Sequence, residues 1–357
     1  MNLSRRDDAA GVPWKQRIID CARTLGFDAV GVARADQPLG VEHDRYLAFI
    51  AAEKHGNMGY LAENREARRS LDSEAILPGA KSVICLARSY RRSSEAEASD
   101  PPLAKLCASY ARGHDYHNHL RKKLRALARF VKTLGPNIAA RPLLDEEPVL
   151  ERAWAARAGL GFVGKNGLVI VPGQGSFVLL GEVVTTLELP ADTPMEERCG
   201  SCTRCLDVCP TQAFSAPFAL DPRRCIAYLT IEDPLSEDAS RPRSGEHLFG
   251  CDDCQSVCPY NRGEVRSGRT GSFEPLPAFA GKSLNDVVRF DEAEFRVFTT
   301  GSPLFRATRA GLARNAVAVA KTRLASGATS AADRADAECA VAAGLTHDDP
   351  VVRRAAE

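Results

Sequence analysis

The sequence has no long apolar run. Its most apolar stretch, residues 168–189, is interrupted by Pro172 and Glu182, whereas a membrane-spanning helix needs about 20 consecutive apolar residues. The opening MNLSRRDDAA also lacks the apolar segment of a secretory signal. We therefore expect a cytoplasmic protein with no membrane contact, in which disulfide bonds do not account for the cysteines.

The sequence also has almost no excess of charge of either sign. Its 47 basic and 46 acidic residues give a formal net charge of +1, so a polyanionic partner would have to be held by a local basic patch. Residues 112–132 contain seven basic residues and one acidic residue, and residues 295–323 contain six and none. Solvent-facing helices carry similar runs, so charge alone does not distinguish a binding patch from an ordinary helix face.

Eight of the twelve cysteines gather between residues 199 and 258. They form one C-x2-C-x2-C-x3-C-P run at 199–210 and a shorter C-x2-C-x3-C-P run at 251–259, with Cys225 between the two. In bacterial two-cluster ferredoxins, three closely spaced cysteines ligate one [4Fe-4S] cluster and the fourth ligates the other. The spacing therefore predicts two such clusters and a protein that transfers electrons.

The second run lacks its first cysteine, because Leu248 occupies the position where a symmetric copy would need one. We expect Cys225 to supply that thiolate. The ferredoxin pattern then assigns one cluster to Cys199, Cys202, Cys205 and Cys258, and the other to Cys209, Cys225, Cys251 and Cys254. Two tetrahedral zinc sites are the alternative for CxxC pairs, but they do not account for the longer run.

Length and composition favour a soluble globular protein of two or three domains, with 357 residues, 44% of them hydrophobic and 26% charged. Helical and strand patterns alternate in the first half of the chain. Helices are predicted over 14–25, 120–134 and 148–158, and strands over 29–33 and 82–87. This alternation is typical of an α/β unit.

Two further segments complete the expected fold. Residues 168–171 and 177–187 are predicted to pair as a hairpin. From residue 302 onward the pattern is helical, and residues 347–356 are similar to the start of a helix in HEAT-type repeats. The expected fold class is therefore multidomain, combining α/β and α+β units with a HEAT-like helical end.

Gly159, Gly161 and Gly164 match the dinucleotide-binding fingerprint. That fingerprint requires a strand before the glycines and a helix after them, and here the predicted order is the reverse. We therefore expect these glycines to end a helix and to allow close backbone packing, not to bind a nicotinamide cofactor.

Four motifs in this order closely resemble epoxyqueuosine reductases. They are YARGHDYH at 110–117, DEEP at 145–148 continued by ERAWAARAGLGFVGKN at 151–166, RCIAYLTIE at 224–232, and GCDDCQ at 250–255. The resemblance implies a cobalamin-dependent enzyme with two [4Fe-4S] clusters that reduces epoxyqueuosine to queuosine at the wobble position of the tRNA anticodon. It spans roughly residues 14–262 and weakens beyond them.

The resemblance also implies the domain organisation. It gives a cobalamin-binding domain over 1–192, a ferredoxin-type domain over 193–263, and a helical, HEAT-like segment that contacts tRNA over 264–357. Such a reduction needs an external low-potential electron donor. Nothing in the sequence demands more than a monomer.

Asp145 matches the proton donor of the family. An acid that works near neutral pH needs a raised pKa, from burial or from a neighbouring carboxylate. Glu146 and Glu147 occupy positions where the family commonly has Thr-Gly or Ser-x. We expect these acids to raise the pKa of Asp145 or to take over its role. Without the resemblance, an acid before a helix is most often a solvated cap.

The resemblance further implies the cobalamin contacts. They are Arg65, Tyr110, Asp145, Asn166, Ala227 and Asp252. Ala227 replaces a serine common in the family, so a hydroxyl contact is lost there. The Asp-x-His-x-x-Gly pattern of corrinoid proteins with a histidine ligand is absent, as it is in the family.

Two other functions remain open from the sequence. A corrinoid iron-sulfur reductase of another kind, such as a reductive dehalogenase, would share the cofactors but act on small molecules. A two-cluster electron carrier would not need the large domain ahead of the clusters. The basic residues around Arg306 and Arg309 favour an RNA partner, whose phosphates they could contact.

Overall fold

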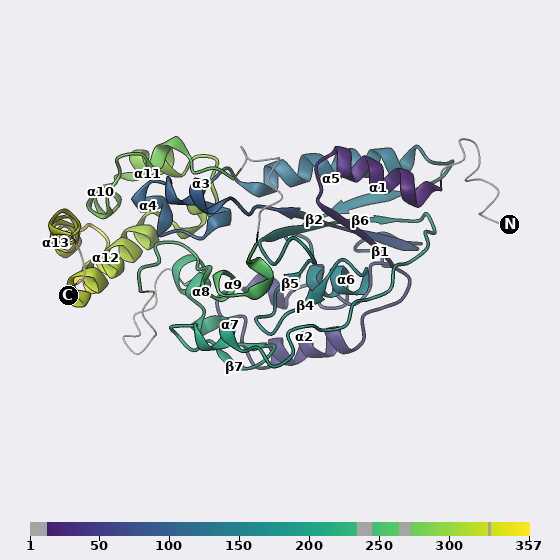
Figure 1. Ribbon diagram of the computed structural model, residues 1–357, viewed down its shortest axis with the longest axis horizontal. Coiled ribbons are helices and arrows are strands. Elements are labelled where there is room, and N and C mark those ends of the chain that lie inside the picture. The colour runs from purple at the N-terminus through teal and green to yellow at the C-terminus, as the bar shows by residue number, and fades with distance from the viewer. Residues whose placement is uncertain (1–12, 234–244, 264–272, 328–329) are drawn as a thin grey trace.

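A four-stranded antiparallel sheet forms the centre of the N-terminal part (Figure 1). The computed structural model describes residues 13–233, 245–263, 273–327 and 330–357. The strands, in spatial order, are β1 (Ala29–Arg34), β2 (Ser82–Ser89), β6 (Val178–Thr185) and β3 (Ala140–Leu143). All three neighbouring pairs run antiparallel. The predicted alternation of helices and strands is therefore confirmed, but the sheet is that of an α+β domain.

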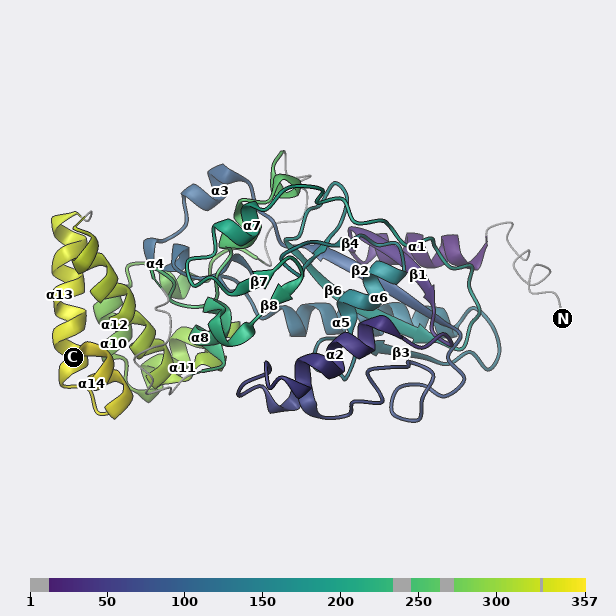
Figure 2. The ribbon, with the colours of Figure 1, turned by 90° about the horizontal axis from the view of Figure 1, so that it is seen from below.

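Helices cover both faces of this sheet (Figures 1 and 2). On one face lie α1 (Trp14–Thr24) and α5 (Tyr116–Lys132), whose apolar residues pack against β1, β2 and β6. On the other face lies α6 (Glu151–Arg157), with α2 (Val41–Ala51) on the same side. The sheet interior is consequently closed to solvent on both sides.

The predicted hairpin is wrong. The short strand β5 (Val169–Ile170) pairs with β4 (Phe162–Val163), and β6 pairs instead with β2 and β3. Gly161 makes the β4–β5 pairing possible, since a Cβ there would lie 2.3 Å from the carbonyl oxygen of Ile170. Gly159 follows α6 with a φ of 65°. The glycines therefore serve the predicted roles of helix end and close packing.

The cysteine region is built from short elements joined by turns. These are α7 (Arg204–Asp207), β7 (Phe214–Ala216), β8 (Ala219–Leu220), α8 (Ile226–Ile231) and α9 (Asp253–Ser256). Short 3-10 turns connect the parts of the molecule, at η3 (Gly59–Ala62), η4 (Ser109–Ala111), η5 (Pro222–Arg224), η6 (Pro259–Asn261), η7 (Pro277–Phe279) and η8 (Pro303–Ala307). The cysteines thus lie mainly at turns and helix starts, where their side chains can converge on a ligand.

The C-terminal part is helical, as predicted. Its helices are α10 (Leu284–Arg289), α11 (Glu292–Thr299), α12 (Arg309–Ser326), α13 (Ala331–Leu345) and α14 (Pro350–Ala356). Their core also takes in α4 (Pro102–Lys105) and the following residues to Ala111, which come from the first half of the chain, as does the short α3 (Ser94–Ala98). Within the described residues no helix is long and apolar enough to cross a membrane.

A buried ion-pair network ties the segment around α4 together. Asp100 has a side chain that is 2% exposed and bonds to Arg92 at 2.7 Å and to Arg112 at 3.1 Å. Removal of one partner from a buried pair leaves unpaired charge in a medium of low dielectric constant.

We expect Asp100→Asn to lower the free energy of unfolding by about 3 kcal/mol, because two buried guanidinium groups lose their counter-charge. Urea unfolding of the purified protein measures this change. Asp36→Asn is the matched control, since Asp36 pairs at the surface with Arg34 and should change the stability far less. Equal effects of the two substitutions would contradict this account.

Candidate active site and iron-sulfur centres

One group of four cysteines lines a cavity of about 250 Å³. Its members are Cys199, Cys202, Cys205 and Cys258. Cys258 comes from the second run of the sequence, so the cavity joins the same cysteines that the ferredoxin pattern assigns to one cluster. Lys165 donates hydrogen bonds to the carbonyl oxygens of Gly200 and Cys202 at 2.5 and 3.0 Å, which fixes the turn between the ligands. The thiol donors and the size of the cavity fit a [4Fe-4S] cluster.

The other four cysteines also lie near one another. Burial, with the nearby Cys225, Asp252, Cys205 and Cys209, raises the pKa of Cys254 to about 12. Backbone N–H groups point at two of the sulfurs: Ala213 donates to Cys209 at 3.3 Å and Asp253 donates to Cys251 at 3.5 Å. Cluster ligation requires thiolates, so binding of a cluster here must release protons.

The spacing of the sulfurs argues against zinc. Around one tetrahedral zinc ion with Zn–S bonds of about 2.3 Å, the four sulfurs would lie roughly 4 Å apart. In the described part of the chain, only His247, Cys251 and Asp253 bring three metal-binding atoms within 4.8 Å of one another. No three cysteine sulfurs of that part do so, so none of them is spaced like the ligands of a single zinc ion.

Asp145 lies on the loop after β3 and is held by the first turn of α5. Tyr116 donates its hydroxyl to Oδ2 of Asp145 at 2.5 Å. Nε2 of His117 lies 3.1 Å from Oδ1 of Asp145, and Nδ1 of His117 lies 2.7 Å from Asp115. Asp115 is also the N-cap of α5 and accepts from the backbone N–H of His117 at 3.0 Å. The helix start therefore fixes an Asp115–His117–Asp145 chain.

This chain decides the protonation of the site. Burial lowers the pKa of His117, but hydrogen bonds to Asp115 and Asp145 outweigh it and raise the pKa to about 10. Burial raises the pKa of Asp145, yet hydrogen bonds from His117 and Tyr116 leave that pKa below its ordinary value. At neutral pH the site thus contains an imidazolium between two carboxylates.

The expectation of a raised pKa at Asp145 is therefore wrong, and the neighbouring acids explain part of the reason. Glu146 forms an ion pair with Arg121. Glu147 accepts a hydrogen bond from the backbone N–H of Leu144 at 3.0 Å. Both carboxylates therefore interact with structural partners. The imidazolium of His117, by contrast, contacts Asp145 directly and lowers its pKa.

Three of the predicted cobalamin contacts adjoin either the surroundings of Asp145 or the cysteines. Tyr110 packs edge-on against Tyr116, with ring centroids 6.0 Å apart. Asp252 accepts from the backbone N–H of Ser109 at 2.7 Å, next to Tyr110. Asn166 donates to the carbonyl oxygen of Cys254 at 3.5 Å. Aromatic faces with polar groups beside them fit a flat, largely apolar macrocycle with a polar rim.

Two predicted contacts remain. Ala227 is on α8 and packs against the core of the C-terminal helices, as Tyr110 does. Arg65 donates to the carbonyl oxygen of Ala62 at 3.0 Å and is exposed. No contact among the described residues joins Arg65 to the other predicted positions.

Sequence reasoning named Arg306 as a phosphate contact but missed that its charge lies near Asp145. Arg306 on η8 forms an ion pair with Glu232 at 2.7 Å and donates to the hydroxyl of Tyr60 at 3.3 Å. Its charge contributes to the lowered pKa of Asp145. This contact joins η3, the end of α8 and the C-terminal part.

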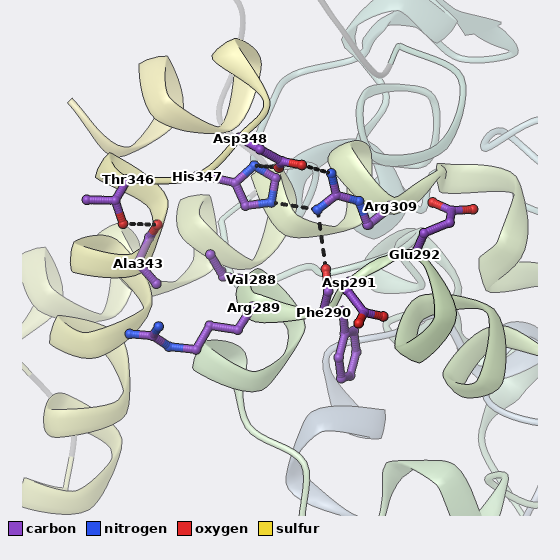
Figure 3. Close-up of a pocket in the computed structure, with 10 residues that line it drawn as sticks. All are labelled: Val288, Arg289, Phe290, Asp291, Glu292, Arg309, Ala343, Thr346, His347 and Asp348. Atoms are coloured by element: carbon purple, nitrogen blue, oxygen red, sulfur yellow. Dashed lines mark hydrogen bonds and ion pairs between the residues drawn. The ribbon is translucent and has the colours of Figure 1, made fainter.

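Most basic residues of α12 have internal partners. Arg309 bonds to Asp348 at 2.6 Å, to His347 and to the carbonyl oxygen of Phe290, at the edge of a hollow of about 490 Å³ (Figure 3). Arg314 donates to the carbonyl oxygen of Leu229 at 2.7 Å. These guanidinium groups hold helices together, so they are poorly placed to meet phosphates.

The basic residues of α5 differ from those of α12. Lys122, Arg125, Arg129 and Lys132 are all exposed. They recur at helical spacing along one face of α5, the helix whose first turn holds Asp145. In the described part of the chain none of these four side chains forms a hydrogen bond or an ion pair.

Two family models match the chain. One, described as "4Fe-4S double cluster binding domain", matches residues 198–261, and the other, described as "Epoxyqueuosine reductase QueG, DUF1730", matches residues 71–145. The chain is 40% identical to the epoxyqueuosine reductase of Gloeobacter violaceus over 309 residues, which are 85% of this chain and 95% of that protein. It is 42% identical to that of Pseudomonas aeruginosa over 315 residues, 86% and 84% of the two chains.

Solved structures agree. A crystal structure of epoxyqueuosine reductase with an epoxyqueuosine-modified tRNA-Tyr stem loop is similar with a TM-score of 0.79 at 30% identity, covering 96% of this chain and 88% of that one. A Bacillus subtilis structure, described with its catalytic aspartate loop swung out of the active site, gives 0.78 at 31% identity and the same coverage. The chain belongs to the epoxyqueuosine reductase family.

Proposed function

We propose that this protein reduces epoxyqueuosine to queuosine at the wobble position of the tRNA anticodon. The observation that carries the proposal is the charged chain from Asp115 through His117 to Asp145, in a chain that also contains two cysteine groups fit for [4Fe-4S] clusters. An acid and an electron supply at one site are what removal of an epoxide oxygen requires. The relatives do not favour a dehalogenase-like reductase or an electron carrier.

The reaction consumes two electrons and two protons, breaks both carbon–oxygen bonds of the epoxide, forms a carbon–carbon double bond and releases water. Bound cobalamin would supply the low-potential centre that reacts with the substrate. Tyr110, Asn166 and Asp252 would hold its ring, with Arg65 and Ala227 as outer contacts. An anticodon base is unpaired and can turn into such a site at modest cost.

Asp145 is the proposed proton donor to the departing oxygen. It is a carboxylate at rest, so its proton must arrive from a neighbour, and Nε2 of His117 lies 3.1 Å from its Oδ1. Asp115 holds the other ring nitrogen and keeps the imidazole in place. Tyr116 fixes the second carboxylate oxygen. A relative whose catalytic aspartate loop leaves the active site supports a loop position for this acid.

The finer organisation is part of the same proposal. We assign residues 1–192 to cobalamin binding, 193–263 to the clusters, and the HEAT-like helices of 264–357, together with α5, to tRNA contact. We also propose that the protein acts as a monomer. The clusters carry electrons but do not generate them, so an external low-potential donor is needed. A tRNA substrate supports a location in the cytoplasm.

Asp145→Asn should lower the single-turnover rate by about a hundredfold or more, because the amide cannot deliver a proton. Nucleoside mass spectrometry of the tRNA measures the rate, and iron and corrinoid content should stay unchanged. Glu147→Gln is the control. Retained activity in Asp145→Asn with loss in Glu147→Gln would move the role to Glu147.

Cys225→Ala should leave one cluster intact and reduce the iron content after anaerobic reconstitution from about eight to about four per chain. Iron analysis and electron paramagnetic resonance measure this. Cys339→Ala is the control, since Cys339 is an exposed thiol outside both groups. Eight irons in Cys225→Ala would show that Cys225 is not a ligand.

Joint substitution of Lys122, Arg125 and Arg129 by alanine should weaken tRNA binding. The slope of log affinity against log salt should fall by roughly two to three, because each lost phosphate contact removes about 0.7–0.9. Filter binding at several salt concentrations measures the slope. Arg309→Ala should leave it unchanged, since Arg309 is paired with Asp348. The reverse result would return the tRNA contact to α12.

A further inference from the structure

A carboxyl group without any partner lies in the middle of the sheet. Glu182 on β6 is 0% exposed, and neither of its carboxylate oxygens has a hydrogen-bond partner in the structure. Its cross-strand neighbours are Cys85 on β2 and Leu143 on β3. Burial of an unpaired ionised carboxylate is so costly that the group keeps its proton instead. An apolar residue would fill this position at lower cost, so the acid calls for a chemical explanation.

Glu182 points to the face that α6 covers. Side chains alternate along β6, and the residues of the same parity, Leu180 and Val184, belong to the core around Trp154 of α6. The first residue of α6 is Glu151. Burial raises the pKa of Glu182 well above its ordinary value, and the nearby Glu151 raises it further. The two carboxyl groups are thus electrostatic neighbours inside the fold.

Glu151 interacts electrostatically with both Glu182 and the active-site residue Asp145. It is half-buried, whereas Glu182 is fully enclosed and the side chain of Asp145 is 35% exposed. Burial and then Asp145 raise the pKa of Glu151 to about 8. The other charged groups that act on Glu151 are Arg152 of the same helix, His117 of α5 and Glu147 of the preceding loop. Glu182 and Glu151 are therefore electrostatic neighbours of each other and of Asp145, the candidate proton donor.

The proposed reaction needs more protons than the donor and its neighbour can hold. The imidazolium of His117 accounts for one, which passes through Asp145. The second proton, which lets the oxygen leave as water, has no source in the Asp115–His117–Asp145 chain once His117 is neutral.

We propose that Glu182 and Glu151 form a buried store for the second proton, which Glu151 passes to Asp145 after Asp145 has protonated the substrate once. This inference rests on the proposed function. Glu182 then returns a proton to Glu151, so that one negative charge remains shared between the two carboxyl groups. Solvent reloads the store when the site opens after turnover. Protons balance, since one leaves His117 and one leaves the glutamate pair for each water released.

Glu182→Gln tests the store, because the amide has nearly the same shape but cannot release a proton to Glu151. The transfer from Glu151 to Asp145 then leaves the whole negative charge on one half-buried carboxylate, which disfavours it. We expect the single-turnover rate of reduced, cobalamin-loaded enzyme to fall by about tenfold or more, with unchanged tRNA affinity and cofactor content. Glu182→Asp, which restores an ionisable acid, should recover part of the rate. Glu188→Gln is the matched control, since Glu188 lies just after β6 with a side chain that is 51% exposed. A wild-type rate in Glu182→Gln would overturn the proposal.

Infrared spectroscopy tests the stored proton without turnover. The wild-type protein at neutral pH should show C=O stretches of protonated, buried carboxylic acids, and the component that belongs to Glu182 should vanish in Glu182→Gln and persist in Glu188→Gln. Glu151→Gln should remove the decline in single-turnover rate above a pH of about 8 that we expect from deprotonation of Glu151. Absence of the infrared band would also overturn the store. Failure of wild-type enzyme to convert epoxyqueuosine would instead overturn the proposed function and leave the infrared result standing.

Discussion

The placement of His117 between two carboxylates is the interaction on which the rest of the site depends. Asp115 does two things at once: it caps α5 and it holds the imidazole. The position of the helix and the charge of the ring are thereby linked, because loss of the cap would also release the ring. Asp145 comes from a different element, the loop after β3, so its distance from His117 depends on the packing of α5 against the sheet.

Charge balance around this chain also connects the parts of the molecule. Arg306 comes from the C-terminal part, Glu232 from the end of α8 and Tyr60 from η3, and their mutual contacts lie close enough to Asp145 to affect its pKa. The C-terminal helices are further tied to the first half of the chain by α4, which is part of their core. Movement of these parts relative to one another would therefore change the electrostatics of the acid as well as access to it.

Local patterns in the sequence predicted the local structure well. Cysteine spacing predicted the cluster ligands, and the cavity around Cys258 brings together the four cysteines that the pattern assigned to one cluster. The glycines after α6 have the predicted roles of helix end and close packing. Features that depend on distant contacts were not predictable. The hairpin of β5 with β6 was wrong because both strands have better partners elsewhere. The predicted direction of the pKa shift at Asp145 was wrong because His117, 28 residues earlier in the sequence, contacts the Asp145 carboxylate.

Glu182 is a second feature whose meaning depends on distant contacts and could not be predicted from the sequence. In the sequence it merely interrupts an apolar stretch, and only the sheet shows that the interruption is enclosed on both faces. A reduction that couples electrons to protons benefits from acids in this position. Protons held inside the fold can reach the substrate without opening the site to water, whereas surface acids exchange freely with solvent. The unpaired carboxyl weakens the core, and such a cost at a single buried position is typical of residues retained for chemistry and not for packing.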